Sequence, residues 1–147
     1  MSRDINIVNK KSRFDYEFIH NEIAGIVLTG TEVKSIFAGK LSLSESFCIF
    51  IDNELFIRNS NIPETDSPYT HKATRDRKLL LKKTELNKLK KELVKGLTIV
   101  PYRVFCNDKG LLKVEIFLAK GKNTQNKKES IKERDIKREI QSNFKYK

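Results

Sequence analysis

The chain has 147 residues, of which 38% are hydrophobic, and this length fits one domain with a single modest core. It carries 30 Lys or Arg against 19 Asp or Glu, and the formal net charge of +11 predicts a partner rich in negative charge. No apolar run reaches the length of a signal peptide or the roughly 20 residues that span a bilayer, so we expect a cytoplasmic protein without a membrane partner.

Residues 1–13 are polar and end in a basic run, which predicts a mobile basic lead-in. Phe14, Tyr16 and Phe18 alternate with polar neighbours, a pattern typical of a half-buried strand. A nearly continuous apolar run over residues 23–28 predicts a second strand. We expect residues 14–119 to form the folded body.

Two short amphipathic helices are predicted further along the chain. Thr31 is a suitable N-cap for the first, apolar residues recur at helical spacing after it, and Gly39 suits its end. Thr84 is a suitable N-cap for the second, whose leucines share one face before Gly96.

Two pairs of strand-like segments are joined by turn-forming residues. The first pair, 47–51 and 55–57, is separated by an Asp-Asn dipeptide, and the second pair is 97–106 and 111–119. With the two early strands the count reaches about six, and the strands cluster instead of alternating with helices. This order favours a mainly β fold, a mostly antiparallel barrel, over a doubly wound sheet.

Residues 59–76 are polar and show no periodicity, and a loop of this length is more often functional or mobile than structural. His71 stands in it just ahead of Arg75 and Arg77, whose spacing of two places both guanidinium groups on one side of an extended segment. We predict that the two arginines bind neighbouring phosphates, although a solvated charged edge has the same pattern. Tyr69 and Tyr102 are candidates for stacking on unpaired bases.

The tail, residues 120–147, carries ten Lys or Arg and four acids, which is more than half of the net charge. Such an arm favours nucleic-acid binding because each neutralised phosphate releases counterions, although charge for solubility alone is an alternative. Four apolar residues at helical spacing form a thin stripe along it: Ile131, Ile136, Ile140 and Phe144. We expect the tail to be disordered when free and to become helical against a partner.

No constellation for catalysis or metal binding is recognisable in the sequence. His20 and His71 lie far apart, Cys48 and Cys106 sit inside apolar segments, and no glycine-rich phosphate motif occurs. We therefore expect no cofactor, no metal ion and no enzyme activity. A small hydrolase or nuclease would have to work without such a constellation.

Four stretches resemble motifs of the SmpB family, in the family's order. They are N-K-K at residues 9–11, A-G-I-x-L-x-G-x-E-V-K-S at 24–35, R-x-R-K-L-L-L at 75–81 and A-K-G-K at 119–122. The resemblance covers about residues 9–140. It implies an OB-fold-like antiparallel barrel of six strands, about three short helices and a basic C-terminal tail.

The resemblance also implies an action. SmpB proteins bind the tRNA-like domain of tmRNA (SsrA), support its delivery as alanyl-tmRNA with elongation factor Tu, and place a basic tail in the decoding region and empty mRNA channel of the small ribosomal subunit. Stalled ribosomes are rescued and the nascent chain is tagged. We expect a monomeric adaptor of this kind; the runner-up is a general single-stranded nucleic-acid or ribosomal protein on a similar small barrel.

The site residues that the resemblance implies form two sets. Contact with tmRNA is expected at Asn9, Lys10, Lys11, Glu32, Lys34, His71, Arg75, Arg77 and Lys78. Contact with the ribosome is expected at Lys120, Lys122, Lys127, Lys128, Lys132, Arg134 and Arg138. For Glu32, a carboxylate that favours a helix N-terminus is an equal alternative.

Several positions depart from the family pattern. Ile23 stands where an acid precedes Ala-Gly, Phe37 where Arg is common, and Ala73 where Pro is usual. The tail hinge reads Q-N-K-K at residues 125–128 instead of Y/H-D-K-R. The change at Ile23 removes one expected tmRNA contact unless Glu22 replaces the missing acid.

Overall fold

The computed structural model describes residues 5–93 and 96–122. Within these ranges the chain forms seven strands: β1 (Asn6–Val8), β2 (Tyr16–Ile26), β3 (Phe47–Ile51), β4 (Glu54–Arg58), β5 (Arg77–Leu80), β6 (Leu97–Cys106) and β7 (Leu112–Gly121). The same ranges contain three helices: α1 (Lys10–Asp15), α2 (Gly30–Phe37) and α3 (Lys83–Glu92).

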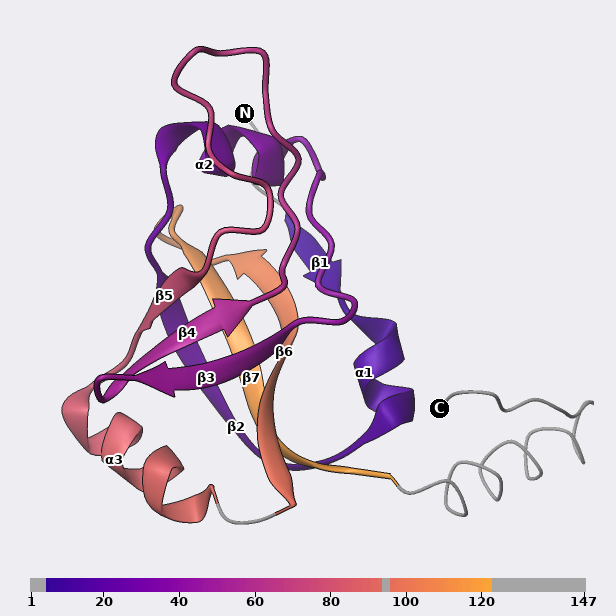
Figure 1. Ribbon diagram of the computed structural model, residues 1–147, viewed down its shortest axis with the longest axis vertical. Coiled ribbons are helices and arrows are strands. Elements are labelled where there is room, and N and C mark those ends of the chain that lie inside the picture. The colour runs from indigo at the N-terminus through magenta and orange to yellow at the C-terminus, as the bar shows by residue number, and fades with distance from the viewer. Residues whose placement is uncertain (1–4, 94–95, 123–147) are drawn as a thin grey trace, which may run out of the picture.

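The strands form one antiparallel sheet that bends back on itself (Figure 1). Its order is β1-β6-β3-β4-β5-β2-β7, and β7 also pairs with β6, so six strands form a ring and β1 extends the edge of β6. The ring is weakest between β3 and β6, which share the single residue pair Cys48 and Ile99. The predicted mainly β, antiparallel fold with three helices is confirmed, with seven strands in the described residues where six were predicted.

The N-terminal segment belongs to the folded body. β1 pairs with β6, with Ile7 opposite Val104, and α1 follows it directly. The prediction of a mobile lead-in over residues 1–13 is therefore wrong for the part of it that the structure describes. The sequence hid both elements because β1 is three residues long and needs a partner strand from the far end of the chain, while α1 has no apolar periodicity.

One long strand, β2, replaces the two early strands that were predicted. It pairs with β7 along most of its length, from Tyr16 opposite Gly121 to Gly25 opposite Lys113. Near Gly25 it also pairs with β5, which is why its last residues are apolar on both sides. The change of pattern marks this second partner strand and not a chain reversal. The folded body also extends past residue 119, since the Lys122 N–H donates to the Asp15 carbonyl at 3.0 Å.

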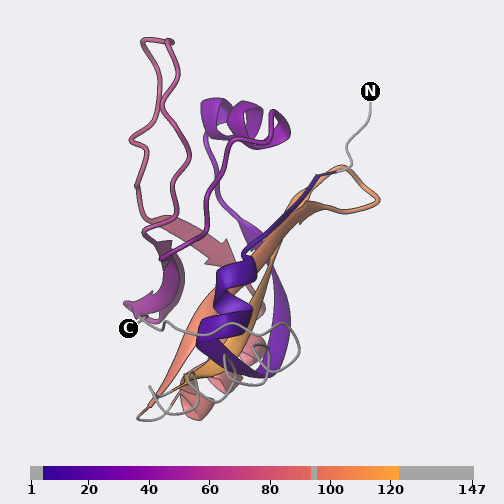
Figure 2. The ribbon, with the colours of Figure 1, turned by 90° about the vertical axis from the view of Figure 1, so that its right-hand side faces the viewer.

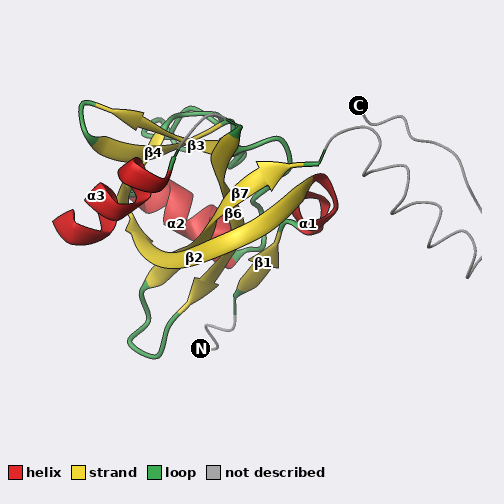
Figure 3. Ribbon diagram, turned by 90° about the horizontal axis from the view of Figure 1, so that it is seen from below, coloured by secondary structure: helices red, strands yellow, loops and turns green. Residues whose placement is uncertain are grey.

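The core fills the inside of the ring. Leu55, Ile57 and Ile99 come from its strands and are at most 1% exposed. Leu89 of α3 is equally buried and closes one end, as the predicted apolar face of this helix requires. Seen from below, α1 and α3 lie on opposite sides of β2 (Figure 3).

Residues that favour turns occupy the turns that the sequence predicted. The β3–β4 hairpin turns at Asp52 and Asn53, both at positive φ (51° and 67°), the geometry that two-residue hairpin loops prefer. Gly39 follows α2 with φ of 79°, a conformation that glycine adopts without strain. The N-cap of α2 is Thr29 and not Thr31, and α3 begins one residue ahead of Thr84.

The two ends of the ring differ. At one end α2 lies beside the β4–β5 loop, residues 59–76, whose limits match the predicted loop (Figures 1 and 2). β7 also starts at this end: its first residue, Leu112, lines a shallow groove together with Val33 and Phe37 of α2. It finishes at the other end, where Gly121 pairs with Tyr16 and the described chain leaves the body at Lys122.

Candidate nucleic-acid interface

Glu32 lies in the first turn of α2 and forms a capping box with Thr29. The Thr29 hydroxyl accepts the Glu32 backbone N–H at 3.3 Å, and the Glu32 carboxylate accepts the Thr29 N–H at 2.9 Å. The side chain of Glu32 has no exposed surface. The alternative role foreseen for Glu32, that of a carboxylate at a helix N-terminus, is therefore observed, and a contact of this buried side chain with RNA stays a prediction.

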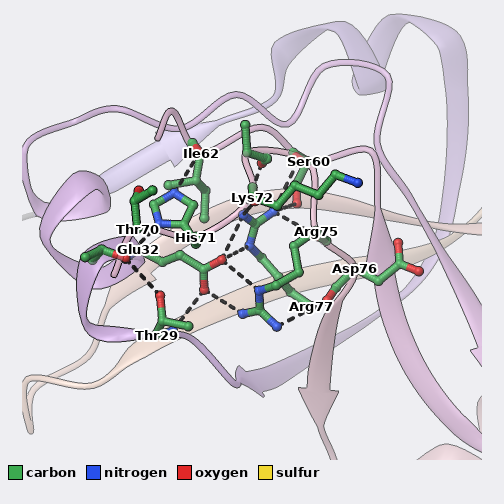
Figure 4. Close-up of polar contacts among 12 residues, drawn as sticks. Thr29, Glu32, Ser60, Ile62, Thr70, His71, Lys72, Arg75, Asp76 and Arg77 are labelled. Atoms are coloured by element: carbon green, nitrogen blue, oxygen red, sulfur yellow. Dashed lines mark hydrogen bonds and ion pairs between the residues drawn. The ribbon is translucent and has the colours of Figure 1, made fainter. Parts of the chain in front are cut away.

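Arg75, near the end of the β4–β5 loop, and Arg77, the first residue of β5, converge on the Glu32 carboxylate (Figure 4). Arg75 donates from Nε to Oε2 at 3.0 Å and from Nη2 to Oε1 at 2.6 Å, a two-pronged contact. Arg77 donates from Nε to Oε2 at 2.9 Å. The spacing of two does place both guanidinium groups on one side of the chain, but they meet a carboxylate of the protein and not neighbouring phosphates.

Arg77 is completely buried, and its remaining N–H groups are also used. They donate at 3.0 to 3.3 Å to the hydroxyl and carbonyl of Ser60 and to the carbonyls of Lys72, Ala73 and Arg75. This burial leaves Arg77 no exposed surface for the expected contact with a phosphate, which stays a prediction. Arg77 instead fixes the path of the β4–β5 loop.

The contacts keep Glu32 ionised. Burial raises the pKa of its carboxyl, but hydrogen bonds from Arg75 and the Thr29 N–H, together with the charge of Arg77, outweigh burial and lower the pKa from 4.5 to about 2. The same bond raises the pKa of Arg75, whereas burial lowers that of Arg77; both guanidinium groups remain charged at neutral pH. The cluster thus holds one excess positive charge, which reaches the surface at Arg75, whose side chain is 34% exposed.

His71 ties the β4–β5 loop to α2. Its Nε2 lies 2.8 Å from the Ile62 carbonyl, which can only accept, so Nε2 carries a proton. In the neutral ring Nδ1 then accepts from the Thr31 hydroxyl at 2.8 Å. The ring is 6% exposed with both nitrogens bonded inside the protein, and the expected contact of His71 with a base or a phosphate stays a prediction. No sequence signal marked Thr31 or Ser60 as partners in this cluster, because each contact joins distant segments.

Asn9 ties the N-terminal segment to two other parts of the chain. Its side-chain Nδ2 donates to the carbonyls of Leu43 at 3.0 Å and Pro101 at 3.4 Å, and the residue is 8% exposed. Its backbone N–H donates to the Tyr102 carbonyl at 2.6 Å. Asn9 is therefore an internal tie in this structure, and the cations beside it on α1 are the groups that face solvent.

Replacing Asn9 by alanine is expected to lower the free energy of unfolding by about 1–3 kcal/mol, because the Leu43 and Pro101 carbonyls each lose one donor, although the Leu43 carbonyl still accepts from Ser46. Urea denaturation measures the change. Asn21→Ala is the matched control: it removes an exposed amide that donates to Glu115 at 2.9 Å, and a change within about 0.5 kcal/mol is expected. Equal losses in the two variants would contradict the role of Asn9.

The exposed lysines among the expected tmRNA-contact residues lie on three different elements. Lys10 and Lys11 lie on α1, and Lys11 pairs with Glu45 at 2.6 Å. Lys34 is exposed on α2. Lys78 lies on β5 and pairs with Glu54 at 2.8 Å.

The expected ribosome-contact residues fall partly within the described chain. Lys120 is exposed on β7, and the ammonium of Lys122 lies 5.9 Å from the centre of the Phe14 ring. The other members lie outside the described residues: Lys127, Lys128, Lys132, Arg134 and Arg138.

The two tyrosines considered for base stacking differ. Tyr69 is 86% exposed at the tip of the β4–β5 loop. Tyr102 packs edge-on against Phe18 and Phe117 at 5.6 and 5.7 Å, and the Arg13 guanidinium lies 5.3 Å from its ring centre. Tyr102 therefore joins α1 to the sheet, and base stacking by Tyr102 or by the exposed Tyr69 stays a prediction.

The described residues were also searched for metal-binding clusters, membrane-spanning helices and reactive cysteines. Residues 5–93 and 96–122 contain no cluster of three or more His, Cys, Asp or Glu arranged to hold a metal ion. None of the helices in these ranges is both long and apolar enough to cross a membrane. Both cysteines are free, and burial raises the pKa of the Cys48 thiol.

Comparison with known proteins shows the family to which this chain belongs. A family model described as SmpB protein matches residues 6–146. The chain belongs to the SmpB family. An SsrA-binding protein of Flavobacterium psychrophilum is 51% identical over 143 residues, 95% of each chain, and one of Phocaeicola vulgatus is 52% identical over 144 residues, 96% of each chain. A solved chain from a tmRNA-SmpB study of the bacterial ribosome is 40% identical, with a TM-score of 0.69 over 88% of this chain and 95% of that one.

The motifs shared with the SmpB family support the ring at two places. Gly25 lies opposite Leu80 where β2 meets β5, and a Cβ at Gly25 would stand 3.3 Å from the Leu80 Cβ, so glycine allows the close approach. The A-K-G-K motif forms the end of β7 and the first residue beyond it. The SmpB motifs therefore mark backbone positions as well as charges.

The departure at Ile23 leaves an apolar surface on β2, where Ile23 is 43% exposed. Glu22 cannot replace the missing acid, because successive side chains of a strand point to opposite faces. Its carboxylate is instead bonded to His20 at 2.8 Å, so His20 is an ordinary half-buried partner and not a free surface histidine.

Proposed function

We propose that this protein is a tmRNA-binding adaptor of trans-translation, which works by binding and not by catalysis. The observation that carries the proposal is similarity over nearly the full chain, with sequence identities of 51% and 52%, to proteins named SsrA-binding protein. The tmRNA-SmpB ribosome structure supports the same partners. The ring binds the tRNA-like domain of tmRNA, and the tail enters the decoding region and empty mRNA channel of the small subunit.

Two finer statements belong to the same proposal. Elongation factor Tu meets the protein indirectly, through alanyl-tmRNA, and the protein acts as a monomer in the cytoplasm, where ribosomes translate. The tail, residues 120–147, is disordered when free and helical on the ribosome, because its thin apolar stripe gains a surface only there.

Competition binding tests the proposal directly. Purified protein is bound to the labelled tRNA-like domain of tmRNA and challenged with equal excesses of a tRNA and of an unstructured RNA at a fixed, near-physiological salt concentration. A strong preference for the tRNA-like domain is expected. Equal competition by all three RNAs would overturn the proposal and favour a general RNA-binding protein on a small barrel.

Arg75→Ala is expected to weaken binding of the tRNA-like domain and to reduce the slope of log K against log salt by about 0.7–0.9, the loss of one phosphate contact. The physical reason is that Arg75 brings the excess charge of the Glu32 cluster to the surface. Arg58→Ala is the control, since Arg58 is an exposed arginine already paired with Asp76 at 2.9 Å. An unchanged slope in Arg75→Ala would show that Arg75 meets no phosphate.

A further inference from the structure

A groove runs between α2 and the outer part of the β4–β5 loop. Its lining residues are Thr31, Lys34, Ser35, Ala38 and Lys40 on the α2 side and Thr65 and Ser67 on the loop side. We propose that this groove binds backbone phosphates of the tRNA-like domain, with Lys34 and Lys40 as cations and the Thr65 and Ser67 hydroxyls as donors. The inference rests on the proposed function and extends its interface to three residues that no motif marked.

The charge of the groove is not neutralised by the protein. None of the ion pairs among the described residues involves Lys34 or Lys40, whereas Lys11 and Lys78 each have a carboxylate partner. Both groove lysines are exposed. The acids of the loop, at positions 64 and 66, alternate with the hydroxyl residues and do not line the groove. An anion that enters therefore meets two cations and no carboxylate.

The loop wall offers oriented hydroxyl groups. The Thr65 hydroxyl oxygen accepts the Ser67 N–H at 3.3 Å, and the Ser67 hydroxyl oxygen accepts the Tyr69 N–H at 3.0 Å. A hydroxyl that accepts from the backbone still has its own proton to donate. These two groups can therefore donate to phosphate oxygens without breaking the turn that positions them.

The wall is held in place before any ligand arrives. His71 bonds Thr31 of α2, and the two arginines hold the loop to Glu32 of the same helix. The Ile62 N–H also donates across the loop to the Ala73 carbonyl at 3.0 Å. A groove with fixed walls loses little conformational entropy on binding, which favours a specific contact. The buried cluster thus acts on RNA indirectly, by holding the groove open.

The position of the groove indicates that the phosphates it binds belong to tmRNA and not to the ribosome. The groove lies at the α2 end of the ring, whereas the chain leaves at Lys122 at the opposite end (Figures 1 and 2). The tail that follows Lys122 is the proposed ribosomal contact. A groove at the end opposite this exit is placed for the other RNA.

The test compares double variants with the same loss of charge. Lys34→Gln/Lys40→Gln is expected to weaken binding of the tRNA-like domain and to reduce the slope of log K against log salt by about 1.4–1.8, two phosphate contacts. Lys88→Gln/Lys91→Gln on α3, at the opposite end, is expected to change the slope by less than half as much. Lys34→Arg/Lys40→Arg keeps both charges and is expected to retain the wild-type slope.

The outcomes separate this inference from the proposed function. Wild-type slope in Lys34→Gln/Lys40→Gln, or an equal loss in the α3 variant, would overturn the groove assignment while the wild-type preference for the tRNA-like domain still stood. Loss of binding to isolated small subunits with normal binding of the tRNA-like domain would also overturn it, since the phosphates would then be ribosomal. Circular dichroism and thermal midpoints check folding, which substitution of exposed lysines is expected to leave intact.

Discussion

Glu32→Gln is expected to lower the free energy of unfolding by about 3–5 kcal/mol, because it leaves the charge of Arg77 buried without a negatively charged partner. Arg75 is partly exposed and can turn to solvent, but Arg77 has no exposed surface. Urea denaturation at neutral pH measures the loss. Glu54→Gln removes the exposed pair with Lys78 and is the control, with an expected loss below about 1 kcal/mol. A loss of that size in Glu32→Gln would show that the cluster contributes little to stability.

The same carboxylate gives a pH signature. Its pKa is lowered from 4.5 to about 2 in the folded protein, so its contribution to stability is complete above about pH 4.5 and disappears as pH falls toward 2. At 1.36 kcal/mol per pKa unit the contribution is about 3 kcal/mol. The unfolding free energy of the wild type should therefore fall more steeply between pH 4.5 and 2 than that of Glu32→Gln. Parallel curves for the two proteins would contradict the lowered pKa.

Ending the chain after Lys122 is expected to leave binding of the tRNA-like domain nearly intact and to abolish tagging of nascent chains. The remaining residues keep a formal charge of +7 and both walls of the groove, whereas the proposed ribosomal contact is lost. Binding is measured with purified RNA, and tagging in a reconstituted translation reaction on a message without a stop codon. A severe loss of RNA binding by the shortened protein would contradict the division of labour between ring and tail.

The position of the cut matters in that experiment. The sequence placed the end of the folded body at residue 119, but Lys120 and Gly121 pair with Glu17 and Tyr16 in β2. A chain that ends at residue 119 is therefore expected to be less stable than one that ends at Lys122. Comparing thermal midpoints of the two shortened proteins separates loss of the tail from damage to β7.

The sequence predicted what depends on neighbours along the chain. The Asp52-Asn53 turn, the stop at Gly39 and the limits of the β4–β5 loop all follow from local backbone preferences. It did not predict the partners of Arg77 or His71. A spacing of two places side chains on one side of a strand, but which group faces them depends on how α2 and the loop pack, and Glu32 lies more than 40 residues away.

Membership of the family came from motif order, and the residues within the motifs were interpreted less well than the motifs themselves. Charged and polar residues in a basic chain suggest contact with RNA, yet the motif residues Asn9, Glu32 and Arg77 are all buried and bonded inside the protein, as is His71 outside the motifs. Burial of a polar residue is hard to predict from one sequence, because it requires a complete set of partners that only the fold assembles.

β7 gives the protein a fixed length. It spans ten residues from the α2 end to the chain exit, about 33 Å at the rise of an extended strand, and it is paired along this length with β2 and β6. A strand held on both edges cannot stretch or bend as a linker does. The protein therefore sets a distance: an RNA bound at the α2 end is kept at a fixed separation from the point where the tail begins. A substitution within β7 would leave this separation unchanged, whereas an insertion or deletion in β7 would alter it.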